Sequence, residues 1–223
     1  MKPKHFLLGI LTIGAVLMLA MYLADLKPAA PLEAIVDAGE YAAELQKFRQ
    51  EKNEYFRENQ ESPLASTQNF DSLPYYAADL NWRIRTLLQL TGDTALYPMA
   101  MTDGKEEKFL RYGRVDFVVN EIPLSLYLFR HKEAADEEKL FLPFTDATNG
   151  EGTYAGGRYL DVDPPESDTI TIDFNLAYNP YCAYSSKYSC PVPPRENHLS
   201  VPVKAGEKDF PKDVLSTLPH AAR

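Results

Sequence analysis

The sequence predicts a mainly β (α+β) fold, with an N-terminal membrane helix and an amphipathic helix ahead of an antiparallel β-sheet or barrel-like domain. Three observations support this prediction. The chain of 223 residues opens with a long apolar run without charges. Residues 33–60 are almost free of glycine and proline and carry apolar side chains at helical spacing. From residue 108 onward, short segments alternate apolar and polar side chains between turn residues, as antiparallel strands do.

The apolar run at residues 6–24 is close to the ~20 residues that a helix needs to cross a bilayer core. Lys2 and Lys4 precede it, and this positive charge predicts an N-terminus in the cytoplasm and a body in the periplasm or at the cell exterior. Signal-peptide cleavage, which would leave a secreted body, is the alternative. Because small residues are poorly placed for cleavage, we expect a transmembrane anchor at 1–24, a linker at 25–32 and one extracytoplasmic domain at 33–223.

The helix expected at 33–60 has an apolar stripe that Lys52 interrupts. Tyr41, Leu45, Phe48 and Tyr55 lie on this stripe at steps of three or four residues, with one step missed. Acidic residues dominate the first turns and basic residues the later ones, as the helix dipole favours. Because the stripe is broken, we expect the helix to pack on its own domain. The alternative is a dimer seam.

The remaining elements are expected to be short strands and loops. Residues 80–90 are compatible with either a strand or a short helix. Alternation at 115–119 and at 124–129, with a turn at 120–123, predicts a hairpin. Further strands are expected at 139–144, 158–162, 169–174 and 199–203. The connections are a glycine-rich loop at 146–157 and a long irregular loop at 175–197, and a closing helix is expected at 211–218.

The body of the protein is acidic. The chain has a formal net charge of −9, and removing Lys2 and Lys4, which precede the apolar run, leaves −11. Such a surface repels nucleic acid and anionic lipid headgroups, so we expect no nucleic-acid partner. An acidic run near residue 165 is interpreted as a solvated turn. It comprises Asp161, Asp163, Glu166 and Asp168.

The loop at 146–157 is the first candidate site, because it combines oxygen-bearing side chains with several glycines. A calcium loop needs acids at alternate positions, and a phosphate loop leads into a helix. The sequence meets neither condition, so we expect no metal and interpret the segment as a tight β-turn region. Arg158, which follows the loop, is expected to pair with Asp146 or Asp173, or to grip a ligand carboxylate.

The segment from Asp173 to Asn197 is the second candidate site. Its tyrosines interleave with polar residues, and such rings suit the recognition of sugars, peptides or heterocycles. Alternatively, the aromatic side chains form a small core within the loop. Together the two loops supply our candidate ligand-binding residues. These are Asp146, Thr148, Tyr154, Arg158, Asp173, Asn175, Tyr178, Asn179, Glu196 and Asn197.

Cys182 and Cys190 are eight positions apart in the part of the chain expected outside the cytoplasm. An oxidising compartment would favour a disulfide between them. Two reduced thiols are the alternative. A metal site is disfavoured because the two cysteines do not form a C-x-x-C pair.

Several long segments resemble a known family. LFLPFTDATNGEGTYAGGRYLDV, DFNLAYNPYCAYSSKYSCPVPPREN and KAGEK lie between residues 140 and 208, and KFRQEKNEYFRENQESPL and RYGRVDFVV precede them. They resemble the bacterial family catalogued as domain of unknown function 1684, over roughly residues 41–210. The resemblance implies a β-rich domain and a bacterial source. It supplies no catalytic residue, ligand or partner.

No catalytic motif stands out, since the sequence has neither G-x-S-x-G nor H-E-x-x-H, and no cofactor is expected. We therefore expect a membrane-tethered binding or accessory module of the cell envelope, for a small polar ligand, a peptide or an envelope protein. The alternative is a hydrolase-like enzyme, which requires two carboxylates among Asp146, Asp173 and Glu196 to meet in a cleft. A third hypothesis is an assembly protein that dimerises through the helix at 33–59.

Overall fold

The computed structural model describes residues 37–64, 70–92, 95–132, 139–211 and 214–215. The expected membrane helix at 6–24 and the linker at 25–32 lie outside these residues. The chain divides after Val36, and the architecture below is that of the unit that begins at Asp37. Within the described ranges, the helices lack the combination of length and apolar character that crossing a membrane requires.

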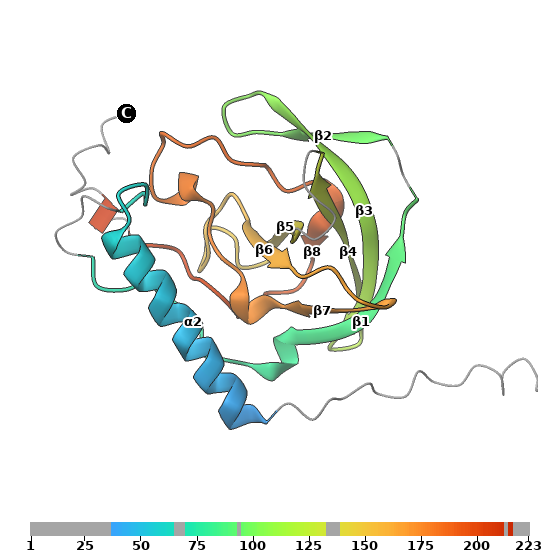
Figure 1. The fold of residues 1–223 in the computed structure, drawn as a ribbon, viewed down its shortest axis with the longest axis horizontal. Helices are drawn as coiled ribbons and strands as arrows, with labels where there is room; N and C mark the ends of the chain where they lie inside the picture. Colours follow the sequence, from blue (N-terminus) through green and yellow to red (C-terminus); the bar gives the residue numbers. More distant parts are fainter. Residues whose placement is uncertain (1–36, 65–69, 93–94, 133–138, 212–213, 216–223) are drawn as a thin grey trace, which may run out of the picture. The chain divides into compact units, whose positions relative to one another are not determined.

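The long helix, α2, extends over Ala38–Glu58 and confirms the expected amphipathic helix. Asp37 caps it, because its side chain accepts hydrogen bonds of 2.9 Å from the backbone N–H groups of Gly39 and Glu40. The buried face carries Tyr41, Leu45 and Phe56. In Figure 1, α2 lies along the segment that follows β7 (Thr169–Asp173), outside the sheet.

The sheet has eight strands, and its main order is β6-β5-β4-β3-β1-β7. Every pairing is antiparallel except that of β5 with β8, so the predicted antiparallel β fold is confirmed. Short 3-10 helices flank the strands: η1 (Leu80–Trp82), η2 (Phe174–Leu176), η3 (Tyr181–Ala183) and η4 (Arg195–Asn197). The strands are β1 (Arg83–Leu90), β2 (Leu96–Ala100), β3 (Glu106–Val119), β4 (Ile122–His131), β5 (Leu140–Asp146), β6 (Arg158–Val162), β7 (Thr169–Asp173) and β8 (His198–Leu199).

The expected hairpin is formed by β3 and β4, joined at Asn120 and Glu121. Both of these residues have positive φ angles, 49° and 65°, as the two central positions of a type I′ turn require. Residues 80–90 form a 3-10 turn followed by a strand, so both interpretations of this segment are partly right. The strands predicted at 139–144, 158–162 and 169–174 correspond to β5, β6 and β7.

Two strands differ from the prediction. β2 was not expected, since it is short and contains Pro98. It pairs with β3 alone in the described sheet, and an edge position tolerates proline. The strand predicted at 199–203 is limited to β8, and beyond it the Val201 carbonyl still accepts the backbone N–H of Ala147, while side chains take the backbone groups of Val203. Val203 donates its N–H to Asp146 and its carbonyl accepts from Arg158. The closing helix predicted at 211–218 is described only at residues 214–215.

The core has a large part inside the curved sheet and a smaller part beneath α2. The large part contains the inward side chains of the strands, such as Leu126, Leu142 and Ile172, which are fully buried. In the smaller part, Tyr184 packs edge-on against Phe56 of α2 and against Phe210. The long loop therefore packs on the helix and the C-terminal segment through Tyr184, while Tyr181 and Tyr188 pack edge-on within the loop, as the alternative proposed.

Candidate binding groove

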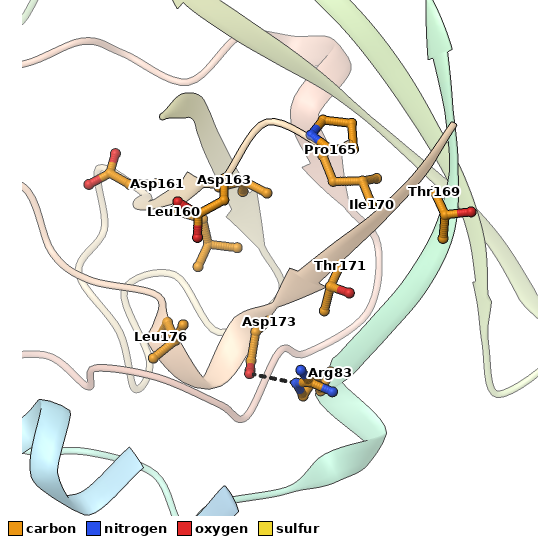
Figure 2. Close-up of a pocket in the computed structure, with 11 residues that line it drawn as sticks. Arg83, Leu160, Asp161, Asp163, Pro165, Thr169, Ile170, Thr171, Asp173 and Leu176 are labelled. Carbon is orange, nitrogen blue, oxygen red and sulfur yellow. Dashed lines mark ion pairs between the residues drawn. The ribbon is translucent and has the colours of Figure 1, made fainter. Parts of the chain in front are cut away.

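Two hollows lie next to each other between α2 and the two ends of the sheet. The larger has a volume of about 510 Å³, and we call it the α2 groove. The smaller, of about 310 Å³, lies between β6 and β7 and is called the seam hollow (Figure 2). Asp161 and Leu176 line both, so the hollows adjoin. The α2 groove is lined by Phe48, Glu51, Lys52, Tyr55, Phe56, Lys139, Asp161, Leu176, Tyr178, Asn179 and Tyr181.

Lys52 connects the wall of the α2 groove to the buried carboxylate of Glu207. Its ammonium lies 2.6 Å from Glu207 Oε1, and the Glu207 side chain has no exposed surface. The other oxygen of Glu207 accepts hydrogen bonds of 2.8 Å from the Asn179 N–H and the Tyr184 hydroxyl. Tyr75 approaches Oε1 at 3.4 Å. A buried carboxylate needs such partners, and this need explains why a lysine interrupts the apolar stripe of the helix.

Tyr178 and Asp161 form the polar centre of the groove. The Tyr178 hydroxyl donates a hydrogen bond of 2.9 Å to Asp161 Oδ2, and the Lys52 ammonium lies 4.6 Å from the centre of the Tyr178 ring. Burial raises the pKa of Tyr178, so the phenol stays protonated and remains a donor. Desolvation also raises the pKa of Asp161, while the Tyr178 hydrogen bond and the charges of Lys139 and Lys52 oppose the rise.

Asn179 adds an unpaired acceptor beside the groove. Its side-chain amide donates to the carbonyl of Lys208 at 2.8 Å, which fixes the orientation of the amide. Its Oδ1 is buried and has no hydrogen-bond partner within the described part of the chain. Leaving such an acceptor unpaired costs about 1–3 kcal/mol, so a ligand or water that donates to it would be favoured.

The seam hollow is closed at one end by a polar cluster around Asp173. Arg83 lies 3.5 Å from this carboxylate, as the dashed line in Figure 2 marks. The Tyr41 hydroxyl of α2 donates to both carboxylate oxygens, at 2.8 and 3.0 Å. Asp173 also caps η2 by accepting the N–H of Asn175 at 3.0 Å. This cluster ties the start of α2 to the end of β7.

Asp146 and Arg158 form a buried ion pair away from both hollows. The Arg158 nitrogen is 2.9 Å from Asp146, and neither side chain has exposed surface. Arg158 also donates to the carbonyls of Val203, Ala205 and Glu207. Desolvation lowers the pKa of Arg158, and the Asp146 charge opposes the change. Of the two roles expected for Arg158, the structure therefore places it in the ion pair, where it fastens the C-terminal segment to the sheet.

The other predicted residues have separate places. Thr148 donates to Asp146 at 2.6 Å, and Asn175 binds the backbone of Asp79. Asn197 binds the backbones of Tyr127 and Pro143, and Glu196 lies on the surface 3.3 Å from Arg111. The hydroxyl of Tyr154 is 3.7 Å from the sulfur of Cys182. Of the ten candidates, Tyr178 and Asn179 line the α2 groove and Asp173 lines the seam hollow.

The three carboxylates of the enzyme hypothesis do not come together. Asp146 pairs with Arg158, Asp173 with Arg83 and Glu196 with Arg111. Within the described residues, no hydrogen bond joins two of these carboxylates. The same residues contain no group of three or more His, Cys, Asp or Glu side chains arranged to hold a metal ion.

Cys182 and Cys190 are free thiols in the structure and lie side by side. The backbone N–H of Cys182 donates to the sulfur of Cys190 at 3.2 Å. Hydrogen bonding from Cys182 lowers the pKa of the Cys190 thiol to about 7. The disulfide between these residues stays a prediction.

Sequence reasoning missed Lys52, Asp161 and Glu207, and it placed Tyr181 in the tyrosine-rich segment without choosing it as a candidate. The break in the helical stripe was a signal for Lys52, since a charged residue on a buried face needs a partner in the body. Asp161 was assigned to a solvated turn, although it lies in β6, where it is the one exposed residue. Glu207 carried no signal of its own in the sequence.

Comparison with known proteins establishes the family. The model described as Protein of unknown function (DUF1684) matches residues 68–208. This chain belongs to that family. The resemblance found in the sequence is thereby confirmed. Within this DUF1684 chain, the matched range includes Asp161, Tyr178, Asn179 and Glu207, while Lys52 precedes it.

One similar solved structure is the solution NMR structure of an uncharacterized protein from Haloarcula marismortui. The two sequences are 34% identical, and the match covers 76% of this chain and 95% of the Haloarcula chain, with a TM-score of 0.62. Among curated proteins, no match to this DUF1684 chain is found. The comparisons thus give the family and the fold of the body.

Proposed function

We propose that this protein is a binding module that holds a small polar ligand or a peptide in the α2 groove. The observation that carries the proposal is the Tyr178–Asp161 pair, which combines an aromatic face with a carboxylate at the centre of an open hollow. The volume of about 510 Å³ falls in the range of ~300–1,000 Å³ that is usual for ligand pockets.

The chemistry of the groove wall supports recognition of a molecule with both apolar and polar parts. Phe48 and Tyr55 are 38% and 41% exposed on the groove side of α2, where both offer apolar area. Tyr55 also packs edge-on against Phe56 and accepts a hydrogen bond from the Tyr181 hydroxyl. Asp161 Oδ1 and Asn179 Oδ1 have no hydrogen-bond partner within the described residues, and both are acceptors. A ligand with a flat apolar body and N–H or O–H donors matches these features.

The test is a binding screen monitored by NMR on the full chain in detergent micelles. The probes are a library of small polar compounds, sugars, dipeptides and tripeptides. We expect shift changes to gather on Asp161, Tyr178 and Asn179. The variant Tyr178→Phe, which loses one hydroxyl, should weaken binding, whereas Tyr127→Phe, outside both hollows, should not. If no probe perturbs the groove, or all hits lie elsewhere, the proposal is wrong.

Membrane tethering through residues 6–24 is part of the proposal, and the apolar run supports it. The body would then work in the periplasm or at the cell exterior, as a module of the cell envelope. Fractionation followed by protease treatment of spheroplasts tests this location. Digestion of the body by external protease is the expected result, and a body that stays protected in the cytosolic fraction contradicts it.

A hydrolase-like enzyme is the second candidate, and one observation favours it. Asp161 has a raised pKa beside a protonated Tyr178 in an open groove, and a carboxyl group of this kind is suited to proton transfer. The test is a panel of chromogenic esters, glycosides and peptide amides. Hydrolysis that is lost in Asp161→Asn and kept in Asp163→Asn supports an enzyme, and no hydrolysis of any member argues against it.

A further inference from the structure

The two ends of the sheet meet at a seam that is not hydrogen-bonded. β6 and β7 are consecutive strands joined by residues 163–168, yet no ladder links them in the described chain. They come close to each other, but each pairs with a different strand, β6 with β5 and β7 with β1. The connection contains Pro164 and Pro165, which have no N–H to donate and so cannot extend a ladder from the turn.

Backbone groups of both strands point into this seam. Leu88 donates its N–H to the carbonyl of Asp168, and this bond fixes which residues of β7 direct their backbone groups toward β1. Ile170 and Ile172 therefore bond to β1, while Thr171 directs its N–H and carbonyl to the other side. The N–H of Thr171 has no partner within the described part of the chain.

The backbone groups of β6 also alternate between its two sides. Tyr159 exchanges backbone hydrogen bonds of 2.9 and 3.0 Å with Tyr178, on the side away from β5. Two residues later, Asp161 directs its N–H and carbonyl to that side as well, and in the described residues nothing receives them. β6 thus already accepts one extended segment of the chain at Tyr159, and leaves the next position open.

The seam hollow separates these open edges. Figure 2 shows Asp161 and Asp163 on one side of it and Thr171, Asp173 and Arg83 on the other. Its volume is about 310 Å³, enough for a short stretch of polypeptide. An extended peptide is the molecule that carries donors and acceptors on both of its sides with a two-residue period, so it matches both edges. Since β6 and β7 run antiparallel, it would lie parallel to one and antiparallel to the other.

The charges at the seam select a basic peptide. Asp163 pairs with Lys139 at 3.2 Å, and Asp173 pairs with Arg83. Asp161 has no ion-pair partner within the described residues, although it stands at the junction of the seam hollow and the α2 groove. A lysine or arginine side chain on the bound segment would supply the missing cation.

We propose that the seam binds an extended peptide by main-chain hydrogen bonds to Asp161 and Thr171, with a basic side chain of the peptide against the Asp161 carboxylate. This inference rests on the proposed function and specifies its ligand class, since the bound segment would continue into the α2 groove. Desolvation raises the pKa of Asp161 although the charges of Lys139 and Lys52 oppose the rise, so a further cation close to this carboxylate would stabilise its ionised form.

The test uses the full chain in detergent micelles and a library of blocked octapeptides. Each peptide has one lysine, and its other positions are drawn from Thr, Val, Leu and Tyr. The tightest member is then compared with its analogue N-methylated at alternate residues, which keeps every side chain but loses the N–H groups on one side. We expect N-methylation to weaken binding at least about tenfold, with shift changes at Asp161 and Thr171.

Two protein variants complete the experiment. Thr171→Pro removes the N–H that faces the seam without removing a bond to β1, so the strand should be retained and binding lost. Asp161→Asn should weaken the lysine peptide by about tenfold and leave its norleucine analogue unchanged. The comparison of the unmodified and N-methylated peptides uses the wild-type protein, so it tests main-chain recognition even if Thr171→Pro fails to fold.

The outcomes separate this inference from the proposed function. Equal binding of the N-methylated and unmodified peptides overturns main-chain recognition at the seam. If that binding perturbs Tyr178 and Asn179, the α2 groove remains a binding site while the seam does not. If no peptide binds, the seam proposal is wrong, and small-molecule hits from the first screen would still support the groove.

Discussion

Replacing Lys52 by methionine should destabilise the protein strongly, because the change leaves the Glu207 carboxylate buried without its cation. The pair has an N–O distance of 2.6 Å, the Glu207 side chain is fully buried and that of Lys52 is 17% exposed. Removing one partner of a buried pair costs ~3–5 kcal/mol. Three hydrogen bonds to Glu207 remain, from Asn179, Tyr184 and Tyr75, so we expect a loss of about 3 kcal/mol.

The assay is equilibrium unfolding in urea, followed by the fluorescence of Trp82. This residue is the single tryptophan of the chain, and it is buried against Phe174 in the core. A loss of about 3 kcal/mol is a large fraction of the ~5–15 kcal/mol that holds a domain folded, so the midpoint should fall clearly.

A second variant and a control make the result specific. In the double variant that combines Lys52→Met with Glu207→Gln, the neutral amide can still accept hydrogen bonds. It should therefore regain about half or more of the unfolding free energy that Lys52→Met loses. Lys47→Met changes an exposed lysine of the same helix, and should leave the midpoint unchanged. If Lys52→Met unfolds at the same urea concentration as the wild type, the Lys52–Glu207 pair does not stabilise the fold.

Three further predictions concern the rest of the body. Arg158→Leu should cost ~3–5 kcal/mol of unfolding free energy in the same assay, because it leaves Asp146 buried without its cation, and an unchanged midpoint would contradict this role. Gly157→Ala should cost about 1–3 kcal/mol, since Gly157 has a φ of +93° and a Cβ there would lie 2.7 Å from the carbonyl oxygen of Phe144; heat-induced unfolding measures the effect. With both thiols reduced, stability should rise from pH 7 to about 8.5, because the folded protein loses the Cys190 proton near pH 7 while the unfolded chain still holds it. Urea unfolding at several pH values would show this rise, and Cys190→Ser should abolish it.

Local sequence patterns predicted those elements for which hydrophobic alternation and turn residues occur within one short segment. The hairpin of β3 and β4 was found because alternation and a turn occur together in one short segment. β6 and β7 were found because each is a short segment of strand-forming residues between turn residues. The strand predicted at 199–203 does not reach Val203, because Asp146 and Arg158, distant in sequence, take the backbone groups of that residue. Such competition is invisible in a local window.

The candidate site was less accessible to sequence reasoning for the same reason. Tyr178 and Asn179 were found because tyrosines and amides gathered in one loop. Lys52 and Glu207 become meaningful only as a pair, and they lie on a helix and near the C-terminus respectively. The charges that the sequence analysis favoured, Asp146 and Arg158, satisfy each other in the interior. A buried pair and a binding residue have similar sequence signatures, and burial alone distinguishes them.

The position of α2 depends on a small number of polar contacts. Of its 21 residues, three are buried, so apolar packing alone holds it weakly. Tyr41 donates to Asp173 near its start, and Lys52 reaches Glu207 farther along. The same helix forms one wall of the α2 groove. It follows that these ties fix the groove as well as the helix, so a substitution that frees α2 should weaken binding even where it touches no ligand.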